Sequence, residues 1–409
     1  MSVIKPFRAL RPGQNLAEKI ACVPYDVPYD SEVREYIADN PQSFLRVTRP
    51  EAEFPKGSSP GDSETLAKSK ENLEKFISEG WLKQDDEPAI YIYRLTAGPH
   101  TQTGIVATCS IDEYDAGLIK KHEKTRPDKV KDRTDHMVYL GAQTGLIFLA
   151  FRGTDETRRI IAEETSREPI FDFPCDEDGV RQTVWQVSDP DALVAAFEDV
   201  PAIYVADGHH RAESASLARK VMKEKNPDHT GDEPYNFVMA GVFPAEDLKI
   251  LPYNRAVKDL NGLGKEDFLS RISSSFRFEK TGQKSPKHPR SIAMYLEGEW
   301  YTLEYAVENV QELNAIERLD VSLLQQNILT PILGIDDPRT NTRITFVGGS
   351  RGTDELERLV DSGEYAVAFS MFPTSMDDLF AVSDMGEIMP PKSTWFEPKL
   401  KDGLFVHLI

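Results

Sequence analysis

The stretch from Ala202 to Lys225 leaves the chain little choice of local structure. The apolar run Ala202–Ala206 ends at Asp207-Gly208, and a run of this length is typical of a buried strand. Between Arg211 and Lys225, small and apolar side chains recur at helical spacing, and neither Gly nor Pro interrupts them. The pattern predicts a strand, a tight turn and a helix.

The turn has the side chains that a phosphate site needs. Asp207 is expected at or near the N-cap of the helix, and Gly208 allows a ligand to approach the backbone. His209, His210 and Arg211 follow, where backbone N–H groups and the positive helix end attract an anion. Asp-Gly turns and capping Asp residues are also common without a ligand. Three cationic or donor side chains at one helix end would repel one another, and this favours a bound phosphate.

Composition limits the classes of protein and partner. The chain has 409 residues, enough for two or three domains with buried cores. It contains no apolar run of about 18 residues and no signal-peptide pattern at its start, so we expect a cytoplasmic protein that does not span a membrane. Cys22, Cys109 and Cys175 form no CxxC pair, and each is predicted to be a buried apolar residue.

The charge distribution points to a local anion site in an acidic protein. A net charge of −20 disfavours binding to nucleic acid and to anionic membranes. Residues 120–136, called the basic segment below, depart from this trend with seven basic and four acidic residues. The segment is either an anion site or a solvated helical face with ion pairs four residues apart. Pro127 is expected to break it.

The order of predicted elements favours a mixed α/β fold. Strands are predicted at 20–27, 43–48, 89–95, 103–111, 146–151 and 236–242, helices at 64–79, 190–199 and 354–361, and hairpins at 169–187, turning at 176–179, and at 291–305. Because helices separate some strands while hairpins join others, we expect mixed sheets with flanking helices. Boundaries near Ala89 and in the polar loop 281–289 divide the chain into residues 1–88, 89–285 and 286–409.

His122-Glu123 lies inside the basic segment and is a candidate for proton transfer. Neighbouring cations would keep the Glu123 carboxylate ionised, as a general base requires, although a plain ion pair has the same composition. Arg255, in a largely apolar segment, is either a salt-bridge partner or an anion ligand, and its context favours the salt bridge.

An irregular segment near the end of the chain is a further candidate. Two prolines at 390 and 391 precede Lys392, Ser393 and Thr394. Irregular segments with such side chains often line sites, although Lys392 could equally be a solvated loop residue.

These motifs resemble those of known families. Over nearly its full length the chain is similar to the bacterial and archaeal family called domain of unknown function 1015, on Pro6–Pro12, His122–Thr125, Asp207–Arg211 and Met389–Thr394. More distantly, from about Thr103 onward, it resembles free L-serine kinases of the ParB/sulfiredoxin-like superfamily, in which the last three blocks occur in the same order. The predicted boundaries give an N-terminal α/β region in residues 1–88, a core in 89–285 and a C-terminal α/β region in 286–409. The resemblance implies that the core binds nucleotide and that the C-terminal region completes the substrate site.

The resemblance implies roles for the matching residues. Glu123 matches the catalytic base of the kinases, with His122 beside it. The nucleotide phosphates would be held by Asp207, Gly208, His209, His210 and Arg211. The acceptor would be held by Lys392, Ser393 and Thr394. Asp207 would also take part in catalysis by placing Mg²⁺.

The chain also departs from the kinases. Glu123 and Asp207 are farther apart, so residues 151–187 look like an insertion, and residues 1–88 have no counterpart. Ser393 replaces a Thr, and Trp395 stands where the kinases have a charged residue.

We therefore expect a phosphotransferase that uses ATP or ADP with Mg²⁺ to phosphorylate the hydroxyl of free L-serine. The alternative is a nucleotide-binding regulatory protein of the ParB-like superfamily without transfer chemistry. The net charge and the lack of a recognisable helix-turn-helix disfavour its DNA-binding form. Sulfiredoxin-like chemistry would need a Cys in the turn, and residues 207–211 contain none. No pattern predicts an oligomeric state.

Overall fold

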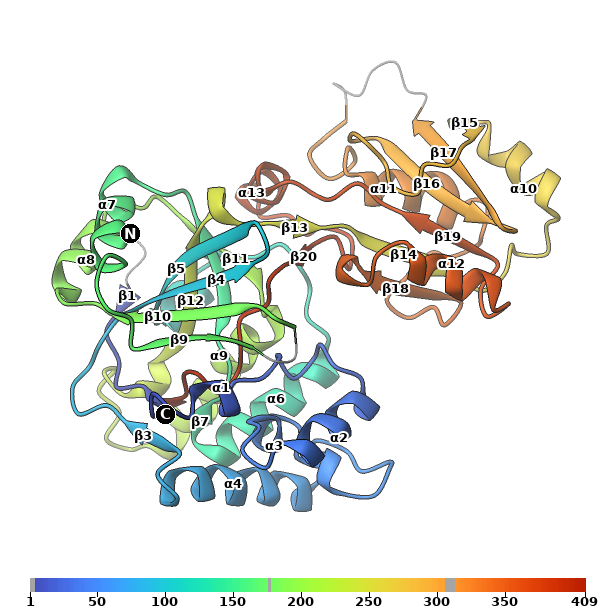
Figure 1. Ribbon diagram of the computed structural model, residues 1–409. Helices are drawn as coiled ribbons and strands as arrows, with labels where there is room; N and C mark the ends of the chain where they lie inside the picture. The colour runs from blue at the N-terminus through green and yellow to red at the C-terminus, as the bar shows by residue number, and fades with distance from the viewer. Residues whose placement is uncertain (1–3, 176–177, 306–312) are drawn as a thin grey trace. The chain divides into compact units, whose positions relative to one another are not determined.

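The computed structural model describes residues 4–175, 178–305 and 313–409. Contacts divide the chain into two compact units (Figure 1). The first unit comprises Met1–Lys121, Thr125–Leu248 and Pro398–Ile409, and the second comprises His122–Lys124 and Lys249–Glu397. The chain therefore passes between the units four times. The ranges 1–88, 89–285 and 286–409 stay a prediction about domains.

A mixed nine-stranded sheet forms the centre of the first unit. Its order is β6-β11-β8-β12-β5-β4-β10-β9, with β1 also paired to β5. The pairs β6/β11 and β8/β12 are parallel and the others are antiparallel, which confirms the predicted mixed α/β class. The strands are β1 (Ile4–Lys5), β4 (Tyr91–Ala97), β5 (His100–Ser110), β6 (Ile119–Lys120), β8 (Ile147–Phe151), β9 (Phe171–Pro174), β10 (Arg181–Gln186), β11 (Ile203–Asp207) and β12 (Phe237–Pro244).

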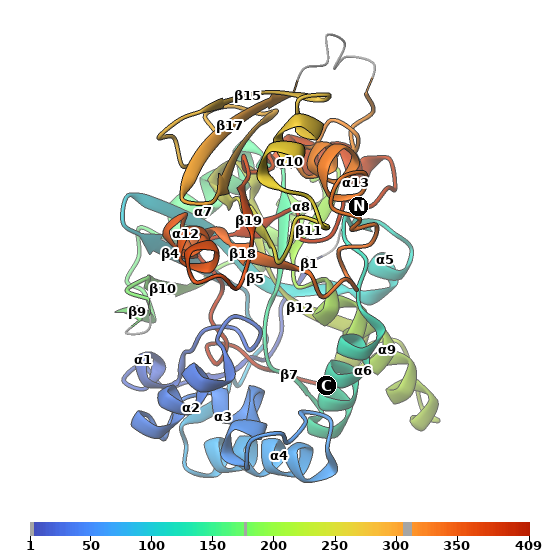
Figure 2. The same ribbon diagram turned by 90° about the vertical axis from the view of Figure 1, so that its right-hand side faces the viewer.

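Helices pack on this sheet through small and branched side chains. Ala212, Ala215 and Ala218 recur on one face of α9 and share a core with Val205 and Leu149. Small residues let the helix lie close to the sheet. The helices α6 and α9 lie side by side (Figure 2). The helices of this part are α5 (Ile111–Asp115), α6 (Pro127–Leu140), α7 (Asp155–Glu164), α8 (Pro190–Phe197) and α9 (His209–Lys225).

The N-terminal residues form a second core within the first unit. Phe44, Leu45, Val47 and Phe76 belong to it. The N-terminal elements are β2 (Leu10–Pro12), α1 (Ala17–Ile20), α2 (Asp30–Asp39), α3 (Leu45–Thr48), η1 (Pro50–Glu53), α4 (Ser63–Ser78) and β3 (Leu82–Gln84). Later short elements of the first unit are β7 (Ala142–Gln143), η2 (Pro234–Asn236), η3 (Ala245–Asp247) and β21 (His407–Leu408). The strand predicted at 43–48 is wrong, because this short apolar run forms the helix α3. A run this short fits a buried strand or a buried helix, and tertiary packing decides between them.

The strand predicted at 20–27 is also wrong. Helix α1 ends at Ile20, and Cys22 forms an isolated bridge to Asp402 instead of a strand. Cys22, Cys109 and Cys175 are free and buried, as predicted. The predicted hairpin at 169–187 is confirmed by β9 and β10, whereas residues 176 and 177 of its predicted turn lie outside the described residues.

The second unit is built on a six-stranded antiparallel sheet. Its order is β15-β17-β16-β19-β14-β18. Helix α12 packs on it through Leu356, Leu359 and Val360, which meet Ala256 and Ala368. The elements are β13 (Ile250–Leu251), β14 (Tyr253–Val257), α10 (Lys265–Ile272), β15 (Phe276–Lys280), β16 (Ser291–Leu296), β17 (Glu299–Tyr305), α11 (Asp320–Leu324), a π-helical turn η5 (Gln325–Leu329), β18 (Ile344–Gly348), η6 (Gly349–Arg351), α12 (Asp354–Asp361), β19 (Val367–Ser370), α13 (Met376–Asp384) and β20 (Trp395–Phe396).

A helix that crosses a membrane must be long and largely apolar. Within residues 4–175, 178–305 and 313–409, no helix combines the length and the apolar character needed to cross a membrane.

Gly104 marks a close approach of β5 to the ring of Phe243 on β12. A Cβ at position 104 would lie 2.5 Å from two ring atoms of Phe243. Because both residues belong to central strands, we expect Gly104→Ala to lower the free energy of unfolding by about 1–3 kcal/mol through overpacking. Urea unfolding measures this.

Two controls accompany the Gly104 variant. Gly13→Ala, where no atom lies within 4 Å of a Cβ, should leave stability nearly unchanged. Adding Phe243→Leu to Gly104→Ala should restore part of the lost stability. A Gly104→Ala protein as stable as the wild type would contradict the close approach.

Candidate functional site

The turn after β11 adopts a backbone conformation that suits glycine. Gly208 has φ 88° and ψ 27°, in the left-handed region, and is the N-cap of α9. Asp207 is the last residue of β11, one position before that cap, and a register irregularity precedes it. Gly208 has no side chain that could cap the helix, so the first turn of α9 presents backbone N–H groups at a positive helix end.

Asp207 is held as a carboxylate by two donors. Its Oδ2 is 2.8 Å from Lys399 Nζ, and its Oδ1 accepts from the Gly208 N–H over 2.9 Å. Burial alone would raise the pKa of Asp207, but the positive charges of Lys399 and Arg211 outweigh it and hold the pKa well below its usual range. A third of the side chain is exposed, 34%. Asp207 is therefore an ionised group that solvent or a ligand can reach.

His210 links the turn to the basic segment. The Arg126 N–H donates to His210 Nε2 over 3.0 Å. This bond fixes the ring of His210 beside the start of α6. His209, by contrast, is buried. The two predicted phosphate-binding histidines therefore differ in exposure.

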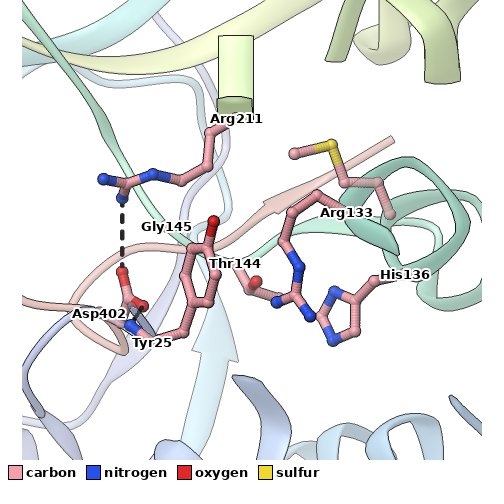
Figure 3. A pocket seen from close by; sticks show the side chains of 8 residues that line it. Tyr25, Arg133, His136, Thr144, Gly145, Arg211 and Asp402 are labelled. Atoms are coloured by element: carbon pink, nitrogen blue, oxygen red, sulfur yellow. Dashed lines mark hydrogen bonds and ion pairs between the residues drawn. The ribbon is translucent and has the colours of Figure 1, made fainter. Parts of the chain in front are cut away.

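The side chain of Arg211 points into the first unit and packs against the turn at Gly208. Its Nη1 donates to the Leu146 carbonyl over 2.6 Å and lies 3.9 Å from Asp402 Oδ1 (Figure 3). A Cβ at Gly208 would lie 3.3 Å from Arg211 Nε, so the guanidinium packs against the turn. Burial would lower the pKa of Arg211, but the carboxylates of Asp26, Asp402 and Asp207 keep it raised. Its charge is compensated by groups of the first unit.

A pocket lies beside Arg211 (Figure 3). Asp402 lines it with 1% of its side chain exposed, and its buried Oδ1 accepts no hydrogen bond among the described residues. Burial raises the pKa of Asp402 to about 7, although Arg211 opposes this. The lining residues are Tyr25, Arg133, His136, Met137, Thr144, Gly145, Arg211 and Asp402. The sequence did not indicate this pocket, because its residues come from distant segments.

Most of the basic segment forms part of a helix. Pro127 does not break it but begins α6, because proline suits the first position of a helix, where no N–H partner is needed. Lys131 pairs with Asp135 four residues on, as in a solvated helical face. Arg133 is instead buried, with its guanidinium carbon 4.4 Å from the centre of the Tyr25 ring.

In the second unit, His122 meets the segment that holds Lys392–Thr394. The Met389 N–H donates to the His122 carbonyl over 2.8 Å. His122 Nε2 is 3.4 Å from Thr394 Oγ1, and the imidazole is buried. Two blocks more than 260 residues apart in sequence therefore lie together, with Glu123 directly after His122 and partly exposed.

The segment at 390–394 is fixed by its own hydroxyl groups. Ser393 Oγ donates to the Pro390 carbonyl over 2.6 Å, and Thr374 Oγ1 donates to the Ser393 carbonyl over 2.9 Å. Lys392 has φ 56°, which a residue with a side chain rarely adopts. Its exposed ammonium lies 5.4 Å from the centre of the Tyr253 ring. Ser393 therefore shapes the segment, and Lys392 projects from it.

Arg255 corrects a prediction. Among the described residues it forms no ion pair with a carboxylate, although the sequence context favoured a salt bridge. Its guanidinium donates to the carbonyls of Tyr253 and Lys392, the latter over 3.0 Å. Position within an apolar strand does not reveal whether an acidic side chain reaches across from another segment.

Lys399 is a site residue that sequence patterns did not indicate. It follows the matched block 389–394 and reaches Asp207 from 192 positions away in the chain. No local pattern marks such a pair. The structure places Asp207 and Lys399 in the first unit, and His122, Glu123 and Lys392–Thr394 in the second.

Comparisons with known proteins place the chain in a family. A family model described as "Protein of unknown function (DUF1015)" matches residues 4–322. No curated protein matches the chain significantly.

Some solved structures are similar to this chain, at low identity and low TM-score. A free serine kinase in complex with AMP has a TM-score of 0.37 and 12% identity, covering 74% of this chain and 91% of that chain. SbnI with a C-terminal truncation, from Staphylococcus aureus, has a TM-score of 0.40 and 12% identity, covering 74% and 87%. A conserved hypothetical protein from Pyrococcus furiosus has a TM-score of 0.36 and 13% identity, covering 75% and 95%.

The conformation of Gly208 predicts a cost for any side chain there. Gly208→Ala combines a left-handed backbone with a Cβ 3.3 Å from Arg211 Nε. Gly141→Ala is the matched control, because Gly141 is also left-handed but its Cβ would make only an ordinary contact of 3.7 Å. We expect the control to lose about 1–2 kcal/mol of unfolding free energy and Gly208→Ala to lose more. Equal losses in urea unfolding would contradict the packing of Arg211 against the turn.

We expect the buried His136 to make the free energy of unfolding of the first unit depend on pH in the acid range. Burial and the nearby Arg133 charge lower the pKa of His136 to about 3. An unfolded His titrates near pH 6.5, so the unfolded chain binds more protons between about pH 6.5 and 3. The stability contributed by neutral His136 is therefore lost as the pH falls through this window, by at most about 1.4 kcal/mol per pH unit.

Unfolding free energies measured against pH test this assignment. His136→Gln should flatten the slope between about pH 6.5 and 3, whereas the exposed control His288→Gln should not. A slope unchanged in His136→Gln would show that other groups cause the acid sensitivity.

Proposed function

The chain belongs to the DUF1015 family of proteins of unknown function, and we propose that it is a nucleotide-dependent phosphotransferase acting on the hydroxyl of free L-serine. The contact between His122 and Thr394 carries this proposal. These residues lie in the two blocks that resemble the base and acceptor segments of serine kinases. Their meeting within one unit supports a shared acceptor site.

Glu123 is the proposed general base. Its side chain is partly exposed and follows the buried His122, whose backbone is fixed by Met389. The Glu123 carboxylate takes the proton of the serine hydroxyl as the hydroxyl oxygen bonds to the terminal phosphorus of the nucleotide. The bond between that phosphorus and the bridging oxygen breaks, so the products are O-phosphoserine and a nucleotide shortened by one phosphate.

The turn at Asp207–Arg211 is the proposed phosphate site. Backbone N–H groups after Gly208, with His209 and His210 beside them, favour the charge that develops on the transferring phosphate. Arg211 supports the turn from inside the first unit, where its guanidinium donates to the Leu146 carbonyl. Lys399 adds an ammonium next to Asp207.

Mg²⁺ fits the proposed site through Asp207. Protein-bound Mg²⁺ is commonly held by one or two carboxylates together with nucleotide phosphates and waters. Asp207 is ionised and a third exposed, and no group of three or more potential metal ligands occurs among the described residues. The ion would neutralise phosphate charge and orient the terminal phosphate. Asp207 would bind it together with the nucleotide.

Substitution of the partly exposed Glu123 should lower turnover specifically. With L-serine, Mg²⁺ and ATP or ADP, the wild type should form O-phosphoserine, detected by mass spectrometry. Glu123→Gln keeps the shape but cannot accept the proton, so turnover should fall by about 10²- to 10⁴-fold with nucleotide affinity retained. Glu266→Gln, an exposed residue of the same unit, is the matched control and should keep full turnover.

Two outcomes would contradict the proposal. Unchanged turnover in Glu123→Gln would remove Glu123 from the mechanism. Nucleotide binding in a thermal-shift assay without turnover of any hydroxyl acceptor would favour the regulatory alternative, a protein that binds nucleotide without transferring phosphate.

A further inference from the structure

Arg255 is a buried cation that has no acidic partner within the described part of the chain. Only 3% of the residue is exposed on strand β14. Its Nη1 donates to the Tyr253 carbonyl and its Nη2 to the Lys392 carbonyl over 3.0 Å. A guanidinium has five N–H donors, so these two bonds leave others available.

Of the other buried arginines, Arg211 lies 3.9 Å from Asp402, whereas Arg133 donates to the Thr48 carbonyl over 3.4 Å. For Arg255, burial lowers the pKa to about 9, and no carboxylate among the described residues counteracts this. An uncompensated buried charge is costly, and proteins retain such charges mainly where a ligand completes the pairing.

A second cation and several aromatic rings lie near Arg255. The exposed Lys392 ammonium lies over the Tyr253 ring, which meets the Trp395 ring edge-on with centroids 5.2 Å apart. The Arg255 guanidinium lies 5.4 Å from the centre of the Phe346 ring. The acidic residue of this segment, Glu397, accepts from Trp395 Nε1 over 2.9 Å and forms no ion pair with Arg255.

We propose that Arg255, assisted by Lys392, binds the carboxylate of the acceptor. This rests on the proposed function and adds the residues that recognise the carboxylate of the acceptor. A planar guanidinium matches the two oxygens of a carboxylate, and Lys392 contributes charge without strict geometry. A free amino acid has this carboxylate, whereas a serine within a peptide does not. The pair therefore selects free serine over a serine side chain of a protein.

The backbone around Lys392 fits this role. Its φ of 56° is sparsely populated by residues with side chains, and such conformations persist where surrounding bonds enforce them. Arg255 supplies one such bond to the Lys392 carbonyl, and Ser393 supplies another through its hydroxyl. Arg255 thus positions the second cation and presents its own remaining donors.

Equilibrium binding of L-serine and L-serinamide to the full-length chain tests the proposal by calorimetry, because serinamide lacks the carboxylate charge. The wild type should prefer serine by about 10- to 100-fold, as expected for a buried charge-assisted pair. Arg255→Gln should remove this preference, and Arg255→Lys should retain part of it. Arg277→Gln, an exposed arginine of the same sheet, is the matched control and should keep the preference.

Three results would overturn the proposal. Equal wild-type affinity for serine and serinamide would exclude carboxylate recognition. A parallel loss of both ligands in Arg255→Gln would mean that Arg255 only shapes the segment. Loss of inorganic phosphate or AMP binding in that variant, with the serine preference retained, would assign the anion to the nucleotide.

Two further measurements separate the possible failures. If Arg255→Gln does not fold, Lys392→Gln serves instead, because Lys392 is exposed; its serine preference should fall, and an unchanged preference in it would count against the pair. A wild type that prefers serine but turns over no nucleotide would refute the phosphotransferase while leaving the carboxylate site intact.

Discussion

The buried guanidinium of Arg211 is the charge around which the first unit's site is organised. It is bonded to the Leu146 carbonyl, faces Asp402 and packs beneath Gly208. Carboxylates from both ends of the chain, Asp26 and Asp402, stabilise this buried cation. The position of the turn at Asp207–Arg211 therefore depends on segments remote from it in sequence.

The final residues of the chain connect these charges. Lys399 pairs with Asp207 and Asp402 faces Arg211, so one short segment meets both charged residues of the turn. The same segment pairs through its backbone with Cys22, and Leu10 bonds to Val406. These contacts explain why residues 398–409 belong to the first unit although the preceding residues belong to the second. They also tie the N-terminal region to the turn at Asp207–Arg211.

Two of the buried arginines, Arg211 and Arg255, illustrate the difference between a compensated and an uncompensated charge. Arg211 is surrounded by carboxylates of its own unit, which gives it a structural role. Arg255 is bonded to two carbonyl oxygens, which satisfy hydrogen bonds but bring no negative charge. This contrast assigns support of the turn to Arg211 and ligand recognition to Arg255. Burial alone does not distinguish them.

The sequence by itself determined the local units. The strand, turn and helix around Gly208 follow from periodicity and glycine's freedom at positive φ, and the helix at 354–361 from its apolar spacing. Short apolar runs such as 43–48 did not determine their own structure, because strands and helices bury them equally well. Only the tertiary structure decided which charges meet. The Lys399–Asp207 pair, the contact of His122 with Thr394 and the isolation of Arg255 all join or separate side chains far apart in the chain. Charges attract one another through space, whatever their separation in the sequence. Local sequence patterns describe only residues that are close along the chain, so they do not show which charges meet.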